Sequence, residues 1–297
     1  MNTNTLIPRL AAFGAVILWG VSFVATKAVL QEASPVTIIF SRFTLGVITL
    51  IFILRIRGEP LLPPRDTWPA LTFMGFVGIF VHQILQIHGL TLTTAIRTGW
   101  LIGLIPIWSA LLSALVLTRG ELSWSVLTLP TTRGDLLILA STVNWAVYTV
   151  LGHSTLKRLG SVRTTTAVMF LGWLMLLPLF VAGAGWRDYS ALSGVGTGSI
   201  LFLGVGCSGL GYLFWYTALE RIEASKVAAF LYLEPFITFI AAVTLLHEPV
   251  IVTIILGGLL VLAGVFAVQH APARESVQFN PAMQRTSEDL PENFFYE

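Results

Sequence analysis

Long apolar runs constrain this chain more than any other feature of its sequence. Residues 98–117 are twenty consecutive residues without a charge, and about twenty apolar residues form a helix that crosses the ~30 Å hydrocarbon core of a bilayer. Runs of similar length occur at residues 10–30, 35–54, 69–88, 98–117, 135–154, 164–183, 197–217, 227–246 and 250–269. The sequence therefore predicts an all-α polytopic membrane protein, and its apolar runs supply nine membrane-spanning helices.

Composition and charge argue against several other classes. Only 11% of the residues are charged, whereas soluble domains carry roughly a quarter. The formal charge of +2 is too small and too scattered to predict binding to nucleic acid. The single cysteine, Cys207, excludes a disulfide within the chain.

An internal repeat organises the apolar runs. A shift of 129 positions brings residues 98–117 onto residues 227–246 without a gap, and Pro106 then falls on Pro235. Each half of the chain therefore follows one plan.

The repeat extends to other spans and defines the domains. The same shift brings residues 73–78 onto residues 202–207, and a shift of 126 brings Trp19 onto Trp145. The polar, acidic C-terminal stretch shows no hydrophobic period and is typical of disorder. We predict a first repeat, a second repeat and a disordered cytoplasmic tail at residues 1–130, 131–270 and 271–297.

One helix is missing from the first repeat. The last span of the second repeat, residues 250–269, has no counterpart, which would fall between Leu117 and Thr131. Two inverted-topology repeats of five helices would keep every short basic loop in the cytoplasm, whereas nine helices would not. Either the protein has a real deletion of the fifth helix, or a piece of the sequence is lost. We favour the second interpretation.

Basic loops orient the spans, because short loops rich in Lys and Arg stay cytoplasmic. The residues that set the orientation are Arg55, Arg57, Arg65, Lys157, Arg158 and Arg163. We expect a multi-pass protein of the cell (inner) membrane with its N-terminus and C-terminus in the cytoplasm.

Several short motifs resemble one family of membrane proteins. They are LWGVSFVATK at residues 18–27, SRF at 41–43, LEP at 233–235 and HEP at 247–249. In this order, with paired halves, they resemble the EamA-type branch of the drug/metabolite transporter superfamily over residues 8–270. The resemblance implies secondary transport of a small molecule without a cofactor. The Trp-rich spans and Gly99-Trp100 are similar to bacterial exporters of aromatic amino acids, whereas the absent helix and the acidic tail depart from the family pattern.

Aromatic residues in mid-span are the first candidates for substrate binding. Transporters built from inverted repeats bind near the bilayer midplane between the halves. Trp19 and Trp145 are related by the repeat, Tyr148 shares a helix face with Trp145, and Trp100 begins the fourth span. Such rings either stack on an aromatic or cationic substrate or simply face lipid.

Polar residues in mid-span are the second group of candidates. His82, Gln83 and Gln86 lie in the third span, and His82 shares a face with Gln86. They either bind a carboxylate or ammonium group of a substrate or join helices by hydrogen bonds. Asn144, beside Trp145, is the corresponding candidate of the second half. Nothing near His82 has the spacing of metal ligands, so no metal site is predicted.

Three charges, Lys27, Arg42 and Glu234, fall within spans. Lys27 is near a span end and is expected to snorkel to the interface, whereas Arg42 and Glu234 suggest a charge or coupling role. A charged group at mid-bilayer costs at least about 2.5 kcal/mol, so it normally faces a cavity or a partner. Arg42 is predicted to pair either with a substrate carboxylate or with a helix end. Pro235 loosens the helix beside Glu234, which is predicted either to couple transport to protons or to line an aqueous vestibule.

Glycines and catalytic motifs are less informative. Gly99 and Gly103 form GxxxG, which indicates close helix packing, either within the chain or between subunits. The GxGxxG at residues 204–209 lies inside an apolar span and follows no strand, so it is no nucleotide fingerprint. We find no nucleophile elbow, HExxH or Walker motif, and the protein is predicted not to be an enzyme.

Three functional hypotheses follow. The leading one is a secondary transporter that exports small amphipathic metabolites, foremost aromatic amino acids, by alternating access. The second is export of cationic drugs or of a phosphorylated or nucleotide-linked metabolite. The third belongs to another class, a nontransporting membrane scaffold.

Overall fold

A computed structural model describes residues 3–104 and 133–249, and within these ranges the chain is helical, with no strand. The helices of the first repeat are α1 (Thr3–Val29), α2 (Pro35–Ile56), η1 (Arg65–Thr67), α3 (Trp68–Gly75), η2 (Phe76–Val81), α4 (His82–Leu92) and α5 (Ala95–Ile102). The helices of the second repeat are α7 (Arg133–Leu159), α8 (Ser161–Ala182), η3 (Gly185–Ala191), α9 (Gly194–Leu201), η4 (Phe202–Gly211), α10 (Tyr212–Arg221), α11 (Ala224–Ala228), η5 (Ala229–Leu233) and α12 (Glu234–Leu245).

Six helical segments in the described part of the chain are long and apolar enough to cross a membrane. They are Leu6–Val29, Pro35–Ile56, Arg65–Leu92, Ser161–Ala182, Gly194–Arg221 and Lys226–Leu245. The predicted span at residues 135–154 is helical within α7, and the span at residues 98–117 is described only as far as residue 104. The predicted all-α polytopic fold is confirmed, while the span at 250–269 and the tail at 271–297 lie outside the described residues.

The two repeats match in local geometry as well as in sequence. Helices α1 and α7 each have 27 residues, and α2 and α8 each have 22. The third span of each repeat contains a π-helix, η2 and η4, at positions that the 129-residue shift superimposes. Because π-helical segments are rare, their recurrence at equivalent positions indicates one ancestral plan.

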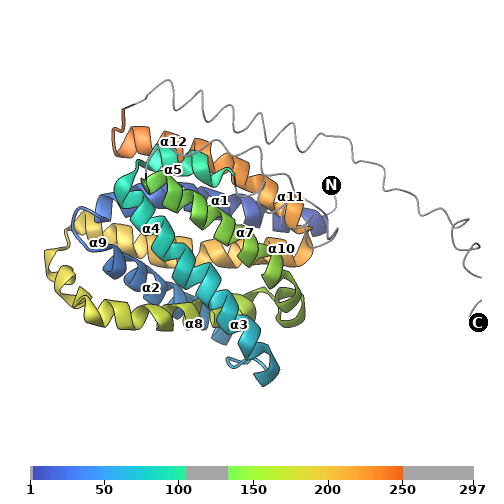
Figure 1. Cartoon of the computed structure of the whole chain (residues 1–297). Helices are drawn as coiled ribbons and strands as arrows, with labels where there is room; N and C mark the ends of the chain where they lie inside the picture. The colour runs from blue at the N-terminus through green and yellow to red at the C-terminus, as the bar shows by residue number, and fades with distance from the viewer. Residues whose placement is uncertain (1–2, 105–132, 250–297) are drawn as a thin grey trace, which may run out of the picture. The chain divides into compact units, whose positions relative to one another are not determined.

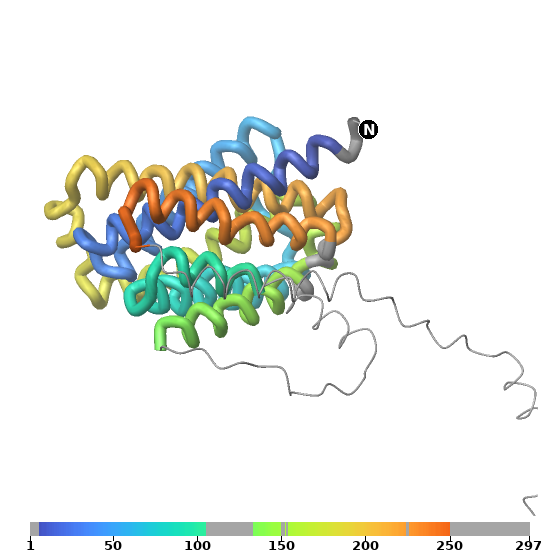
Figure 2. The backbone as a smooth tube through the Cα atoms, turned by 90° about the horizontal axis from the view of Figure 1, so that it is seen from above, coloured from blue at the N-terminus to red at the C-terminus, as the bar shows by residue number. Residues whose placement is uncertain are grey.

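Contacts between the repeats occur in exchanged pairs. Helix α1 packs on α12 and on the α9–η4–α10 span, and its counterpart α7 packs on α5 and on the α3–η2–α4 span (Figure 1). Figures 1 and 2 both show α4 beside α7. Such an exchange of partners is what a twofold axis between the repeats produces.

The pair α2 and α8 gives the direction of this axis. The hydroxyl of Thr37, near the start of α2, donates to the Gly185 carbonyl beyond the end of α8 (3.2 Å), while Nε1 of Trp173, in mid-α8, donates to Thr44 (2.8 Å). The two helices therefore run antiparallel. Since they are related by the repeat, the twofold axis is perpendicular to them, and the repeats have inverted topology.

One end of the helical bundle, which we call the capped end, is held by carboxylates on helix starts. The backbone N–H groups of Ala95 and Ile96 donate to Glu248 (3.0 and 3.2 Å). The backbone N–H of Ser34 donates to Asp188 (2.9 Å), and this bond holds the pKa of the Asp188 carboxyl below its ordinary value. Carboxylates at these positions stabilise the positive ends of the helix dipoles.

The opposite end, which we call the basic end, brings together two loops that are rich in basic residues. Arg158 forms an ion pair with Asp66 (2.6 Å), and Arg163 donates to the Leu62 carbonyl (3.3 Å). The loop after α2 and the loop between α7 and α8 therefore lie at one end, as the basic-loop rule predicted.

Helices α5 and α7 both begin at the capped end. Arg97 of α5 lies 3.8 Å from Asp135 of α7, and the hydroxyl of Thr93 donates to Asp135 (2.8 Å). The chain thus leaves the capped end at α5 and returns to it at α7. The position of the predicted missing helix, between Leu117 and Thr131, lies outside the described residues.

The GxxxG glycines pack within the chain. A Cβ atom added to Gly99 would lie 2.8 Å from Cβ of Thr238, and one added to Gly103 would lie 3.2 Å from Cγ of Pro235. Close packing at these glycines therefore joins α5 to α12, with no need for a second subunit.

Candidate functional site

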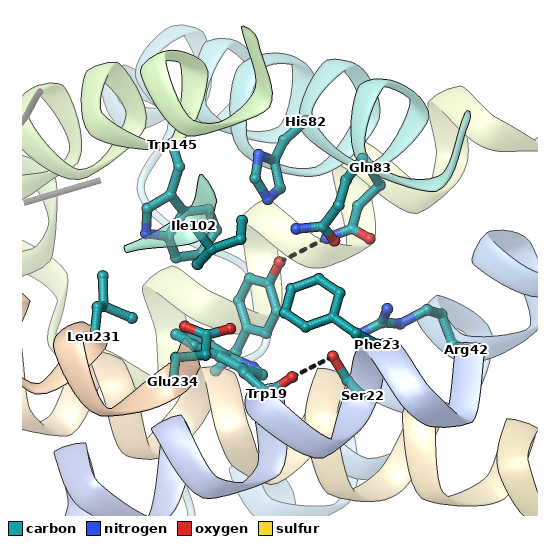
Figure 3. Close-up of a pocket in the computed structure, with 12 residues that line it drawn as sticks. Trp19, Ser22, Phe23, Arg42, His82, Gln83, Ile102, Trp145, Leu231 and Glu234 are labelled. Carbon is teal, nitrogen blue, oxygen red and sulfur yellow. Dashed lines mark hydrogen bonds between the residues drawn. The ribbon is translucent and has the colours of Figure 1, made fainter. Parts of the chain in front are cut away.

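A small cavity lies between the two repeats in the middle of the bundle (Figure 3). The first repeat contributes Trp19, Ser22, Phe23, Arg42, His82, Gln83, Gln86 and Ile102, and the second contributes Trp145, Tyr212, Leu231 and Glu234. Its volume is about 40 Å³, above the roughly 10–15 Å³ that one ordered water molecule requires. Among the described residues the cavity is therefore narrow, with room for water beside its polar side chains.

The cavity lies on the twofold axis between the repeats. Trp19 and its repeat mate Trp145 meet edge to face, with ring centroids 5.5 Å apart. Gln83 and its repeat mate Tyr212 also meet, because the Gln83 amide donates to the Tyr212 hydroxyl (3.2 Å). Only residues near the axis can contact their own repeat mates.

Three aromatic rings form one wall of the cavity. The Tyr212 ring lies edge to face against both Trp19 (5.4 Å) and Trp145 (5.7 Å). The Trp19 indole N–H donates to the Cys207 carbonyl (3.1 Å), which fixes the orientation of that ring. This wall offers polarisable surface to an apolar or aromatic group.

His82 adds a polar group beside the aromatic wall. Its Nδ1 lies 3.0 Å from the Ser141 carbonyl, and because a carbonyl only accepts, this nitrogen carries the proton. Nδ1–H therefore donates to this carbonyl. The imidazole ring lies 4.9 Å from the Trp145 ring, and the half-buried Gln86 lies one turn further along α4.

An arginine and a glutamate side chain also lie at the cavity. Arg42 and Glu234 are 5% and 3% exposed. Nε of Arg42 donates to the Ser208 hydroxyl (3.0 Å), and the guanidinium carbon lies 5.4 Å from the Phe43 ring centroid. In the described part of the chain, neither side chain forms an ion pair.

Three residues predicted to contact substrate lie behind the cavity wall in this structure. The Asn144 amide donates to the Val77 carbonyl of the π-helix η2 (2.6 Å). Tyr148 forms a hydrogen bond with Tyr216, and Trp100 packs edge to face on Phe236 (5.6 Å). These residues support the wall and do not line it.

Other lining residues were not predicted as substrate-binding. Phe23, Ile102, Tyr212 and Leu231 are ordinary apolar or aromatic members of spans, and nothing in their local sequence distinguishes them. Tyr212 could have been found, since the 129-residue shift aligns it with Gln83 of the polar cluster. No group of residues able to hold a metal ion is found within the described ranges.

The fold and the cavity together define a class: multispanning membrane proteins with inverted repeats around a central site. The EamA-like transporter family matches residues 6–128 and 132–269. The chain belongs to the EamA-like transporter family, and its members are transporters and not enzymes.

Several proteins are similar to this chain over most of their length. An uncharacterized transporter of Archaeoglobus fulgidus is 30% identical over 275 residues, covering 85% of this chain and 95% of the relative. The uncharacterized transporter YyaM of Bacillus subtilis is 28% identical over 276 residues, covering 85% and 90%. A probable terminal-alkyne amino-acid exporter of Streptantibioticus cattleyicolor is 25% identical over 272 residues, covering 86% and 91%.

A solved crystal structure shares the fold, with a TM-score of 0.66 at 18% identity over 86% of this chain and 96% of that one.

The sequence comparisons also bear on the number of helices. An alignment of 275 positions that covers 85% of this 297-residue chain must open gaps in it. Together these gaps are about the length of one membrane-spanning helix.

Proposed function

We propose that this transporter exports small amphipathic metabolites, foremost aromatic amino acids, by alternating access. The observation that carries the proposal is the cavity on the twofold axis, lined by the rings of Trp19, Trp145 and Tyr212. Aromatic walls favour an aromatic side chain over an aliphatic one by offset or edge-to-face contacts, worth about 0.5–1.5 kcal/mol for each pair of rings.

Two resemblances support the amino-acid class. The Trp-rich spans and Gly99-Trp100 resemble the bacterial aromatic amino-acid exporter YddG. The relative from Streptantibioticus cattleyicolor is named a probable exporter of a terminal-alkyne amino acid. These resemblances favour a free amino acid over other small metabolites.

Alternating access follows from how the cavity is built. Both repeats contribute to its wall, so a small rotation of one repeat against the other widens it toward one end. The cavity of about 40 Å³ is then the part of the site that such a rotation enlarges to admit substrate.

The basic end gives the orientation of the protein in the membrane. Short basic loops stay in the cytoplasm, so we assign the basic end to the cytoplasmic face of the cell (inner) membrane. Helix α1 begins at that end, so we propose that the N-terminus is cytoplasmic. A final crossing by residues 250–269 would return the C-terminus to the same side.

Efflux from liposomes tests the substrate. Purified protein is reconstituted into liposomes preloaded with labelled phenylalanine, and matched liposomes are preloaded with labelled leucine. We expect phenylalanine to leave faster than from protein-free liposomes and faster than leucine. Loss of phenylalanine at the protein-free rate would refute the proposal.

The other hypotheses are less well supported. Export of phosphorylated metabolites requires several basic groups at the site, and Arg42 is the basic side chain among those that line the described cavity. Export of cationic drugs leaves that arginine uncompensated. A nontransporting scaffold gives no reason for polar residues such as Gln86 to border a cavity.

A further inference from the structure

We propose that Arg42 and Glu234 are two opposite poles of the cavity and that together they select a zwitterionic solute. Such a solute carries both a free carboxylate and a free ammonium group. The inference rests on the proposed transport function and deepens it, because it states which polar groups the substrate must have, whatever its side chain.

The first observation is the state of Arg42. Its side chain is buried, and Ser208 engages Nε alone. In the described part of the chain the two terminal guanidinium nitrogens have no hydrogen-bond acceptor among protein groups, although the side chain lines the cavity. A guanidinium held through Nε keeps its terminal nitrogens available for a planar carboxylate.

The second observation is the state of Glu234. Its side chain is equally buried and also lines the cavity. No hydrogen bond or ion pair to its carboxylate is found among the described residues. A carboxylate accepts bonds at both oxygens, and an ammonium group supplies the complementary donors.

The third observation is the separation of the two poles. Figure 3 shows Glu234 at one side of the cavity and Arg42 at the other, with the Phe23 ring between them. The two side chains come from α12 and α2, hence from different repeats. They do not neutralise each other directly, so a solute placed between them can bind both.

The charges of the solute decide which class the poles accept. Breaking a buried charge pair by removing one partner costs several kcal/mol because the other charge is left unpaired. An amine would compensate Glu234 but not Arg42, and a carboxylic acid would do the reverse. A zwitterion alone compensates both, so we expect it to bind at least about tenfold more tightly than either analogue.

The test compares three ligands of nearly equal shape, L-phenylalanine, phenethylamine and 3-phenylpropionate. Each is titrated against the purified full chain in detergent, and affinity is read from the rise in Tm, because a ligand that binds only the folded state stabilises it. We expect phenylalanine to raise the Tm at concentrations at least about tenfold below those needed for either analogue.

Substitution of either pole should change which of the three ligands binds most tightly. In Glu234→Gln the ammonium partner is lost, so 3-phenylpropionate should bind at least as well as phenylalanine. In Arg42→Gln the preference should move to phenethylamine. Arg42→Lys and Glu234→Asp keep the charges and should still prefer phenylalanine. Glu223→Gln, at an exposed ion pair, is the control and should bind like the wild type.

The outcomes separate this inference from the substrate proposal. Equal binding of all three ligands to the wild type would show that Arg42 and Glu234 do not select a zwitterion. An unchanged order of ligand affinities in both Gln variants would show the same. Either result would leave the proposal of aromatic export intact. L-Leucine is titrated in parallel as a zwitterion without an aromatic ring; if it stabilises the chain and phenylalanine does not, the poles stand and the aromatic assignment fails. If one Gln variant does not fold, the other still tests the exchange. If no free amino acid binds, both proposals fail.

Discussion

At the scale of single residues, Gly172 marks the closest approach of α8 to the third span. A Cβ atom added there would lie 2.8 Å from the Gly75 carbonyl oxygen, which belongs to the backbone and cannot turn away. We expect Gly172→Ala to lower the free energy of unfolding by about 1–3 kcal/mol through overpacking.

Gly198 provides the matched control, because nothing lies within 4 Å of a Cβ atom added there. It lies inside α9, where alanine favours the helix over glycine by up to about 1 kcal/mol. Thermal unfolding in detergent should therefore show opposite signs for Gly172→Ala and Gly198→Ala. Equal shifts of the two variants would contradict the close packing.

Trp145 tests the aromatic wall. Its ring contacts Trp19, His82 and Tyr212 at the cavity, so Trp145→Leu removes the central ring while keeping an apolar side chain. We expect the ratio of phenylalanine efflux to leucine efflux to fall by up to about tenfold. This ratio does not depend on how much protein is folded.

Trp186 is the control for that experiment, since it is 51% exposed at the capped end. Trp186→Leu should leave the efflux ratio unchanged. A wild-type ratio in Trp145→Leu would show that the aromatic wall does not discriminate between side chains.

The sequence predicted part of the cavity for a definite reason. Trp19 and Trp145 are repeat mates, and mates can meet only on the twofold axis, where the cavity lies. The contacts of the Asn144 and Tyr148 side chains could not be predicted from the repeat. Helical spacing tells which residues share a face, but not which neighbour that face contacts, and here the neighbours are a π-helix carbonyl and Tyr216.

At the scale of elements, Glu248 links the segment after α12 to the start of α5. Its carboxylate accepts two backbone N–H groups that have no partner within the helix. We expect Glu248→Ala to lower the free energy of unfolding by about 0.5–2 kcal/mol, as for other lost N-terminal caps. Glu223→Ala, at an exposed site, should change it little; equal losses in thermal unfolding would contradict the cap.

Helices α5 and α7 both begin at the capped end, and this supports the prediction that one helix is missing between them. If α5 continues to residue 117, as the sequence predicts, then residues 118–132 are too few for a second helix to cross back, which needs about 20 residues. An extended return through lipid would leave backbone groups unpaired.

We therefore expect the protein isolated from its cells to be heavier than the 32.4 kDa of this sequence by about one membrane-spanning helix. Intact-mass measurement checks this. A measured mass of 32.4 kDa would show that the deletion is real and that the first repeat is complete with four helices.

The structure also explains why other features of the elements escaped prediction. The π-helices η2 and η4 change the hydrogen-bond register within an apolar run, and the run itself has the same composition as an α-helical span. Hydropathy measures length and polarity, so it located these spans correctly but could not reveal their geometry.

At the scale of the whole molecule, the inverted repeats followed from sequence, because a 129-residue shift aligns spans and their basic loops. The size of the cavity did not, since it depends on how far the two repeats are rotated. The same helices could enclose a cavity of about 40 Å³ or a much larger vestibule without any change in hydrophobic pattern.

If substrate binds in the cavity between the repeats, it should control access of a thiol reagent to position 86, and this access is the most direct test. Gln86→Cys is made in a Cys207→Ala background, and an impermeant thiol reagent is applied to sealed vesicles of each orientation. Ile240→Cys, at a position 61% exposed on the outer face of α12, is the lipid-facing control.

We predict that Gln86→Cys reacts from at least one side of the membrane, that phenylalanine slows the reaction, and that Ile240→Cys does not react. Absence of reaction at Gln86→Cys from both sides, or a rate unaffected by phenylalanine, would contradict a substrate site in this cavity.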